Sequence, residues 1–203
     1  MSVEPSAHEL RKDWIHPPSA VLEDVHAIEE AVSMVGYDHG IANWQLVFVT
    51  DHLRKQKILA SLSDHSGFHA DALAVLCVNP EAWNSPHPNL WEKAEFEARS
   101  HYLDDMFEIG RGNKTLQRDR AMRSVGMAAG ALCSKAQSLG YVVDHLHDVD
   151  ISLVGREIGV PASHQIEYVF CLGHHSNHIA PTSIAQRGRK CVSLEQFSEQ
   201  LLD

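Results

Sequence analysis

The sequence predicts one globular domain of the α+β class, built from helices and short buried strands. Three observations support this prediction: apolar residues recur at helical spacing in several segments, β-branched and aromatic runs lie between those segments, and 44% of the 203 residues are hydrophobic. That composition suits a single compact domain over residues 1–203 rather than a disordered or fibrous chain.

The first elements are expected to be a helix and two strands. Apolar residues at three- and four-residue spacing from Val21 to Val35 predict an amphipathic helix that has Ser19 as its N-cap and ends near Gly36. The β-branched and aromatic run 44–50 predicts a strand, and the apolar run 72–78 predicts a second, buried strand.

A second helix is predicted between these strands, because Asp51 is a favoured N-cap residue. The side chains that this helix is expected to bury are Leu53, Ile58, Leu59 and Leu62. A loop rich in Pro and Asn is expected over residues 80–88, where it is a candidate rim of an active site, and residues 90–107 are expected to be helical.

The longest helix is predicted to begin after Thr115 and to end at Gly140, which acts as its C-terminal cap. The apolar face of this helix carries Met122, Val125, Ala129, Leu132 and Ala136. Glycine and alanine at positions 126 and 128–131 leave the helix surface thin. Another backbone, from the same chain or from a second subunit, can therefore approach it closely.

The remaining predicted elements are short. Residues 141–143 are expected to form a strand, residues 150–159 a capped helix, and residues 166–173 a buried strand. Ser193 and Gln196 form a capping box that predicts a final helix.

Charge and composition argue against several classes of function. A formal net charge of -10 disfavours binding to nucleic acid, because a protein neutralises phosphates with a cationic surface. The sequence has no apolar run of signal-peptide or membrane-span length, so we expect a cytoplasmic protein with no membrane partner. The 4 cysteines form no CxxC pair, which argues against disulfides and a zinc–thiolate site.

Four segments of the chain occur in an order that carries a family resemblance. No GxGxxG, Walker, nucleophile-elbow or HExxH motif occurs. The segments are GIANWQLVFVTD at 40–51, MRSVGMAAGALCSKAQSLG at 122–140, SLVGREIGVP at 152–161 and IEYVFCLGHH at 166–175. Over most of its length the chain therefore resembles the nitroreductase-like family.

The resemblance implies a three-layer sandwich, in which helices flank a mixed, mostly antiparallel central sheet. It also implies an intertwined homodimer that binds FMN at the subunit interface. Such a protein carries electrons in a ping-pong reaction from NAD(P)H to a nitro compound, a quinone or a related small-molecule acceptor. No acid–base triad is needed, because the isoalloxazine ring supplies the redox chemistry.

The resemblance further implies a site for the FMN phosphate. Arg187 and Arg189, just before the final predicted helix, match the family's basic pair, and Arg11 and Lys12 lie near its N-terminal basic motif. Taken without the resemblance, a basic run such as RGRK at 187–190 is ordinarily a solvated turn.

Asn43 and Gln45 match the Asn and Gln of the family segment that leads into the first strand. One interpretation is that their side chains form hydrogen bonds to the polar edge of the flavin. The alternative is that they act only as turn-forming or capping residues.

Gly40 and Leu46 stand where the family segment before the first strand has Ser and Pro, and the chain departs from the family pattern at two further places. Glu9 and Leu10 stand where the first Arg and the Ser of the N-terminal motif are expected. His147 and Asp148 stand where the family usually has small residues, often a Gly pair, beside the reactive face of the flavin. Larger side chains there are expected to narrow or close the pocket.

The 15 histidines of the chain support a rival hypothesis. Five of them cluster in two segments, at His145 and His147 and again at His174, His175 and His178. Imidazoles at such density bind a first-row transition metal if the segments meet in space, and otherwise are ordinary surface residues. The alternative function is therefore a protein of the same fold that lacks normal flavin chemistry and binds a ligand or metal through its histidines.

Overall fold

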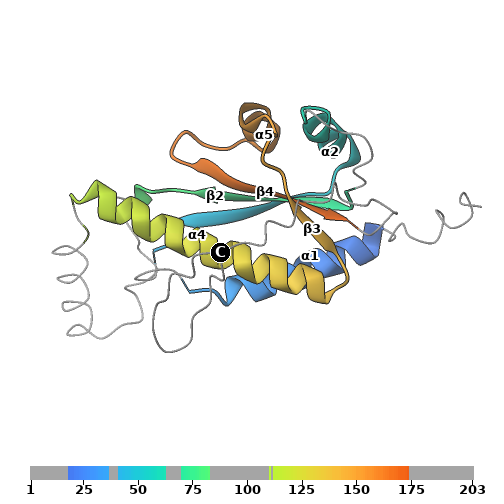
Figure 1. Cartoon of the computed structure of the whole chain (residues 1–203), viewed down its shortest axis with the longest axis horizontal. Coiled ribbons are helices and arrows are strands. Elements are labelled where there is room, and N and C mark those ends of the chain that lie inside the picture. Colours follow the sequence, from blue (N-terminus) through green and yellow to red (C-terminus); the bar gives the residue numbers. More distant parts are fainter. Residues whose placement is uncertain (1–17, 37–40, 63–69, 83–109, 111, 174–203) are drawn as a thin grey trace, which may run out of the picture.

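The computed structural model describes residues 18–36, 41–62, 70–82, 110 and 112–173. These residues form three layers, in which a four-stranded sheet lies between two long helices and two short helices (Figure 1). The α+β class and the three-layer arrangement predicted above are both confirmed.

The sheet has the strand order β1-β2-β4-β3, and each of its three pairings is antiparallel. β2 is buried along its whole length because helices cover both faces of the sheet, whereas β1 and β3 form the edges of the described sheet. Each strand lies within two residues of a predicted one: β1 (Trp44–Val49), β2 (Ala72–Val78), β3 (Val142–His145) and β4 (Gln165–Gly173).

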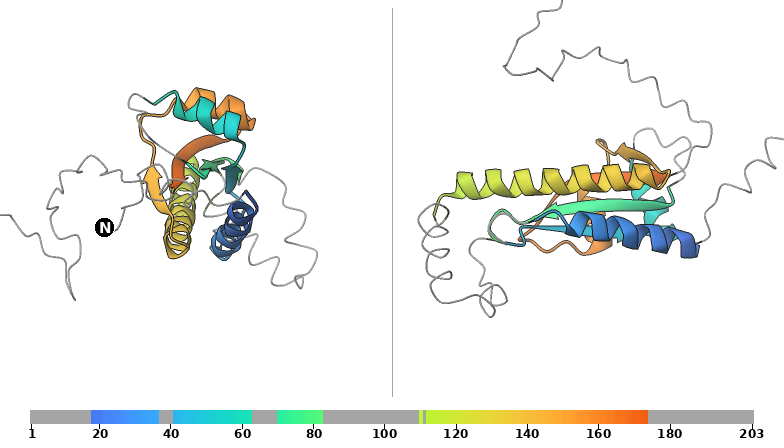
Figure 2. Two further views of the ribbon diagram at one scale, coloured as in Figure 1. Left: turned by 90° about the vertical axis from the view of Figure 1, so that its right-hand side faces the viewer. Right: turned by 90° about the horizontal axis from the view of Figure 1, so that it is seen from below.

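One face of the sheet is covered by α1 (Pro18–Ser33) and α4 (Lys114–Ser138), which lie side by side (Figure 2). The helix predicted to follow a Ser19 cap instead begins at Pro18, a residue whose fixed φ suits the first helical turn. The predicted apolar face of α4 is buried against the sheet, with Met122 half-buried at one end.

The opposite face is covered by α2 (His52–Leu59) and α5 (Ile151–Ile158). The predicted burial of Leu53 is wrong, because its side chain is 74% exposed. Ile58 is the residue of α2 that enters the core, and position 53 lies about 140° around the helix from it.

The two ends of α4 follow from local hydrogen bonds. The helix begins at Lys114, before the predicted start, because the side-chain oxygen of Asn113 accepts from the backbone N–H of Leu116 at 3.1 Å. At the other end Gly140 has a φ of 92°, and the N–H groups of residues 140 and 141 both donate to the last turn at 3.0 Å. The predicted stop at Gly140 is confirmed as a left-handed C-terminal cap.

Some predicted elements lie outside the described residues. They are the loop from position 83 onward, the helix at 90–107 and the capping box of Ser193 and Gln196. The extent of the single domain, residues 1–203, therefore stays a prediction. Within the described part of the chain, no helix is both long and apolar enough to cross a membrane.

Candidate functional site

Antiparallel pairing places the first residues of β1 and β4 and the last residues of β2 and β3 toward one end of the sheet. Asn43 immediately precedes β1 at that end, and His147 and Asp148 follow β3 toward the same end. β1 and β3 are the two edge strands, with β2 and β4 between them, so Asn43 and His147 lie beside opposite edges of the sheet.

The Asn43 side chain is fully buried, with 0% of its surface exposed. Its main-chain oxygen accepts from the N–H of Asn79 at 2.7 Å, but its Oδ1 and Nδ2 atoms have no hydrogen-bond partner within the described residues. A buried amide left without partners destabilises a protein by about 1 to 3 kcal/mol. The Asn43 carboxamide is therefore suited to bind the polar atoms of a ligand.

Four side-chain rings form a continuous series, which we call the ring chain. Tyr168 and Phe170 stack with centroids 5.7 Å apart, and His145 lies 5.4 Å from Tyr168 and 5.2 Å from Phe170. The His147 ring lies 4.0 Å from that of His145. Because Phe170 is buried and His147 is exposed, the ring chain leads from the core to solvent.

The ring chain lies on the face of the sheet that α4 covers. Tyr168 and Phe170 pack with the α1 and α4 core, and the Tyr168 hydroxyl lies 3.9 Å from the place where a Cβ at Gly126 would stand. Gln45 lies on the other face, because its partner Cys77 belongs to the core beneath α2 and α5. The sheet thus separates Gln45, an exposed residue, from the ring chain.

The loop that carries His147 is fixed on both sides. Leu146 and Val149 are buried beneath α2 and α5, and the N–H of Leu146 donates to a β4 carbonyl at 2.8 Å. The carboxylate of Asp150 then caps α5 by accepting an N–H at 3.0 Å. Between these points only His147 and Asp148 are exposed.

Burial controls the protonation of the groups near the site. It lowers the pKa of His145, helped by the neighbouring His147 and opposed by Asp144 and Glu167, so the His145 ring is neutral at neutral pH.

Burial also raises the pKa of the Cys77 thiol to about 11 and that of Cys171 to about 12, and raises the pKa of Cys133. These three thiols are free and protonated, while Cys191 lies outside the described residues.

The predicted phosphate site and most of the predicted metal site lie outside the described residues. These positions are Glu9, Leu10, Arg11, Lys12, His174, His175, His178, Arg187 and Arg189. Among the residues that are described, no group of three or more His, Cys, Asp or Glu is placed to hold a metal ion. Both sites stay predictions.

A small crevice lies along the edge strand β1. It has a volume of about 170 Å³ and is lined by residues of β1 such as Val47, by Thr50 directly after it, by Arg54 of α2 and by Ile158 of α5. Ligand pockets of drug-sized molecules typically measure about 300 to 1,000 Å³. The crevice alone is therefore too small to hold a flavin nucleotide.

Sequence reasoning missed the ring chain as a unit. It singled out His145 and His147 for metal or flavin contacts but did not connect them with Tyr168 and Phe170. The available signal was spacing: His145 and His147 are two residues apart, and so are Tyr168 and Phe170. Residues two apart lie on the same side of a strand or of its extension.

Comparisons with known proteins agree with this fold. No protein-family model matches the sequence. Protein DrgA of Synechocystis sp. is 24% identical over 152 residues, which span 74% of this chain and 72% of that protein. A solved structure described as a nitroreductase from Bacillus subtilis has a TM-score of 0.68 at 14% identity, covering 88% of this chain and 87% of that one.

Two further similar solved structures are of proteins connected with FMN. A nitroreductase from Exiguobacterium sibiricum in complex with FMN has a TM-score of 0.65 at 11% identity, covering 76% of this chain and 78% of that one. An NAD(P)H:FMN oxidoreductase from Staphylococcus epidermidis has a TM-score of 0.60 at 12% identity, covering 86% and 97%. The chain thus has the nitroreductase fold, and the resemblance stated from its sequence is confirmed at that level.

Proposed function

We propose that this chain is an FMN-dependent oxidoreductase that passes electrons from NAD(P)H to a small acceptor such as a nitro compound or a quinone. The observation that carries the proposal is the buried Asn43 carboxamide, which has no hydrogen-bond partner among the described residues and lies where the sequence matches the family segment leading into the first strand. The fold and its similarity to a nitroreductase in complex with FMN support it. When bound, FMN supplies the redox chemistry.

The phosphate group of FMN is proposed to bind Arg187 and Arg189, with Arg11 and Lys12 as further cations. Guanidinium groups bind phosphate oxygens in pairs through charge-assisted hydrogen bonds, which are among the stronger contacts available to a protein. Their positions just before the final predicted helix and near the N-terminus come from the sequence alone.

The remaining contacts are proposed from described residues beside the two edge strands of the sheet. The Asn43 carboxamide donates to and accepts from polar atoms of the flavin ring or ribityl chain, since both its nitrogen and its oxygen lack partners within the described part of the fold. Gln45 is proposed as a second such residue from the sequence match alone, and within one subunit it lies on the other face of the sheet from the ring chain. His147 and Asp148 are proposed to lie beside the reactive face of the ring.

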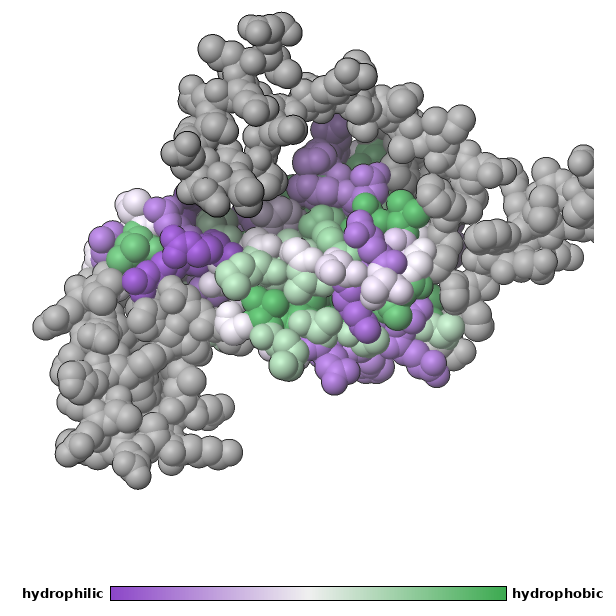
Figure 3. All heavy atoms as spheres, turned by 60° about the horizontal axis from the view of Figure 1, so that its bottom comes forward, coloured by the Kyte–Doolittle hydropathy of each residue, from purple (hydrophilic) through white to green (hydrophobic). Residues whose placement is uncertain are grey.

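A homodimer is proposed to complete the flavin site. Figure 3 shows apolar residues in the middle of the face that α1 and α4 form, with polar residues around them. Leu22 of α1 is 51% exposed and Met127 of α4 is 57% exposed, while a Cβ at Gly130 would meet nothing within 4 Å. This face is apolar and open enough for close approach of a second copy. Light scattering that shows a monomer at working concentration would contradict the dimer.

The flavin assignment is tested by the colour of the purified protein and by titration with FMN. We expect about one FMN per subunit, released on denaturation. The double change Arg187→Ala and Arg189→Ala should weaken FMN affinity at least tenfold, equivalent to about 1.4 kcal/mol, without unfolding the protein. Lys190→Ala, in the same basic run, is the matched control. A colourless protein that binds no added FMN would overturn the proposal and favour the alternative ligand- or metal-binding module.

The Asn43→Leu variant separates binding from folding. Leucine has the same branching and the same number of side-chain heavy atoms as asparagine, and it removes the polar atoms that lack partners among the described residues. The flavin-free variant should therefore stay folded with a stability near that of the wild type. Its FMN affinity should nevertheless fall about tenfold, because the ligand loses its hydrogen-bond partner. Asn79→Ala, on the neighbouring strand end, should leave FMN affinity unchanged. A variant that keeps its flavin affinity would remove Asn43 from the site.

A further inference from the structure

We infer that His147 limits the size of the acceptor that reaches the flavin, so that this protein reduces small quinones or nitro compounds in preference to bulky ones. The inference rests on the proposed function, because it takes the loop after β3 to lie beside the flavin. It adds a structural cause for selectivity, namely a side chain held in place by the ring chain and by its loop.

The ring of His147 is supported from behind. Its centroid lies 4.0 Å from that of His145, which is itself in contact with Tyr168 and Phe170. Phe170 is only 6% exposed, so the inner end of the ring chain is part of the core. An acceptor that pushes His147 toward His145 therefore meets a closely packed series of rings.

The backbone on either side of His147 is also held. Leu146 is 5% exposed and Val149 is 6% exposed, and both pack in the core beneath α2 and α5. The N–H of Asp150 donates to the Ser61 hydroxyl at 3.2 Å, while its carboxylate caps α5. Moving the loop to admit a larger acceptor would extract both apolar side chains and break these hydrogen bonds. Size selection is therefore the expected result.

Steric restriction and hydrogen bonding by the imidazole are distinct explanations of selectivity. A size limit depends on ring volume, whereas a hydrogen bond from the imidazole depends on its N–H group. Phenylalanine keeps a ring at position 147 and has no such group, and alanine removes both. Comparing these two substitutions identifies which property acts.

The test uses the FMN-loaded protein and two quinones of different size, benzoquinone and anthraquinone sulfonate. The kcat/KM of each variant is divided by that of the wild type for the same quinone, so that the intrinsic reactivities of the two acceptors cancel. We expect His147→Ala to raise the relative kcat/KM for anthraquinone sulfonate at least tenfold more than the relative kcat/KM for benzoquinone. His147→Phe should leave the ratio within a factor of about two of the wild type, well below the tenfold that corresponds to about 1.4 kcal/mol.

His26→Ala is the matched control, because His26 is an exposed histidine on α1, away from the ring chain. FMN content is measured for every variant by flavin release. An unchanged ratio in His147→Ala, with FMN bound, would overturn the size limit and leave the proposed function intact. A ratio that rises equally in His147→Phe, or loss of FMN from His147→Ala alone, would overturn it as well. A wild-type protein that binds no FMN would overturn both proposals.

Discussion

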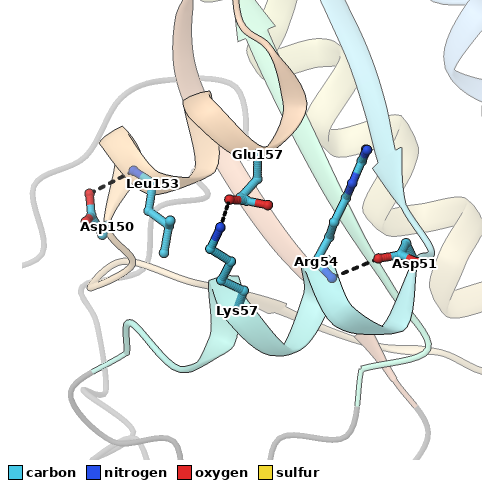
Figure 4. A network of polar contacts seen from close by, with 6 residues as sticks. All are labelled: Asp51, Arg54, Lys57, Asp150, Leu153 and Glu157. Carbon is cyan, nitrogen blue, oxygen red and sulfur yellow. Dashed lines mark hydrogen bonds and ion pairs between the residues drawn. The ribbon is translucent and has the colours of Figure 1, made fainter.

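The two faces of the sheet are stabilised in different ways. On one face α4, a helix of 25 residues, packs beside α1 over a continuous apolar core. On the other face α2 and α5 have 8 residues each and are connected by polar contacts as well as by a smaller core (Figure 4).

The polar contacts of the second face lie at helix ends and between helices. Asp51 caps α2 and Asp150 caps α5, by accepting backbone N–H groups at 2.9 and 3.0 Å. Lys57 of α2 forms an ion pair with Glu157 of α5. Helices this short are marginal in isolation, so caps and partner helices must stabilise them. The loop that carries His147 ends at one of these caps, which links the local stability of α5 to the proposed site.

The largest expected effect is on the α4 face. Leu132 of α4 is 0% exposed, and truncation of such a side chain leaves a cavity in a closely packed core. Leu132→Ala should lower the free energy of unfolding by about 2 to 5 kcal/mol, measured by urea denaturation. Arg118→Ala, at a position of the same helix whose side chain is 63% exposed, should cost less than about 0.5 kcal/mol. Similar losses from both changes would show that the α4 core is loosely packed.

An intermediate effect is expected at the helix caps. Asp150→Ala should cost about 0.5 to 2 kcal/mol, because the N–H of Leu153 loses its acceptor. Hydrogen exchange should then speed up in α5 more than in α4. Lys57→Met is the comparison, because the Lys57 side chain is 60% exposed and an exposed ion pair contributes about 0 to 1 kcal/mol. A larger loss in the free energy of unfolding from Lys57→Met than from Asp150→Ala would contradict this expectation.

The difference between the two faces also explains what the sequence could predict. The apolar residues that recur along α4 and the unbroken apolar run of β2 are features of the local sequence, and both elements were predicted closely. Leu53 was misassigned because α2 has only about two turns, too few for its apolar pattern to define a face. Asn113 was missed as the α4 cap because its hydrogen bond depends on the geometry of one turn.

The candidate site was predicted only in part, for a related reason. Asn43 was identified through the resemblance, but its burial with no hydrogen-bond partner among the described residues follows from packing at the end of the sheet. The ring chain depends on the register that sets His145 opposite Phe170, and the sequence does not give the pairing of β3 with β4. Interactions between distant segments are therefore what remained hidden.

The smallest expected effect concerns pH and the half-buried ring of His145. Because burial lowers the pKa of His145 in the folded protein, protons bind the unfolded chain more readily as the pH falls below about 6.5. The free energy of unfolding should therefore decrease as the pH falls from about 6.5 to the lowered folded-state pKa of His145. Well above a pH of about 6.5, His145 should contribute no pH dependence. His145→Phe keeps a ring in the ring chain and removes the titrating group, so its stability should fall less between about pH 7 and pH 5.

The effect of His147 provides a graded test, because His147 is the second cause of the lowered pKa, after burial, while Asp144 and Glu167 oppose it. His147→Ala should therefore reduce the pH dependence only in part, since the burial of His145 by Tyr168 and Phe170 remains. Melting temperatures of the wild type and both variants across this range should order as expected, with the steepest decline in the wild type and the shallowest in His145→Phe. Parallel curves for all three proteins would mean that His145 is as well solvated in the folded chain as in the unfolded one, and that the ring chain is open to water rather than packed behind His147.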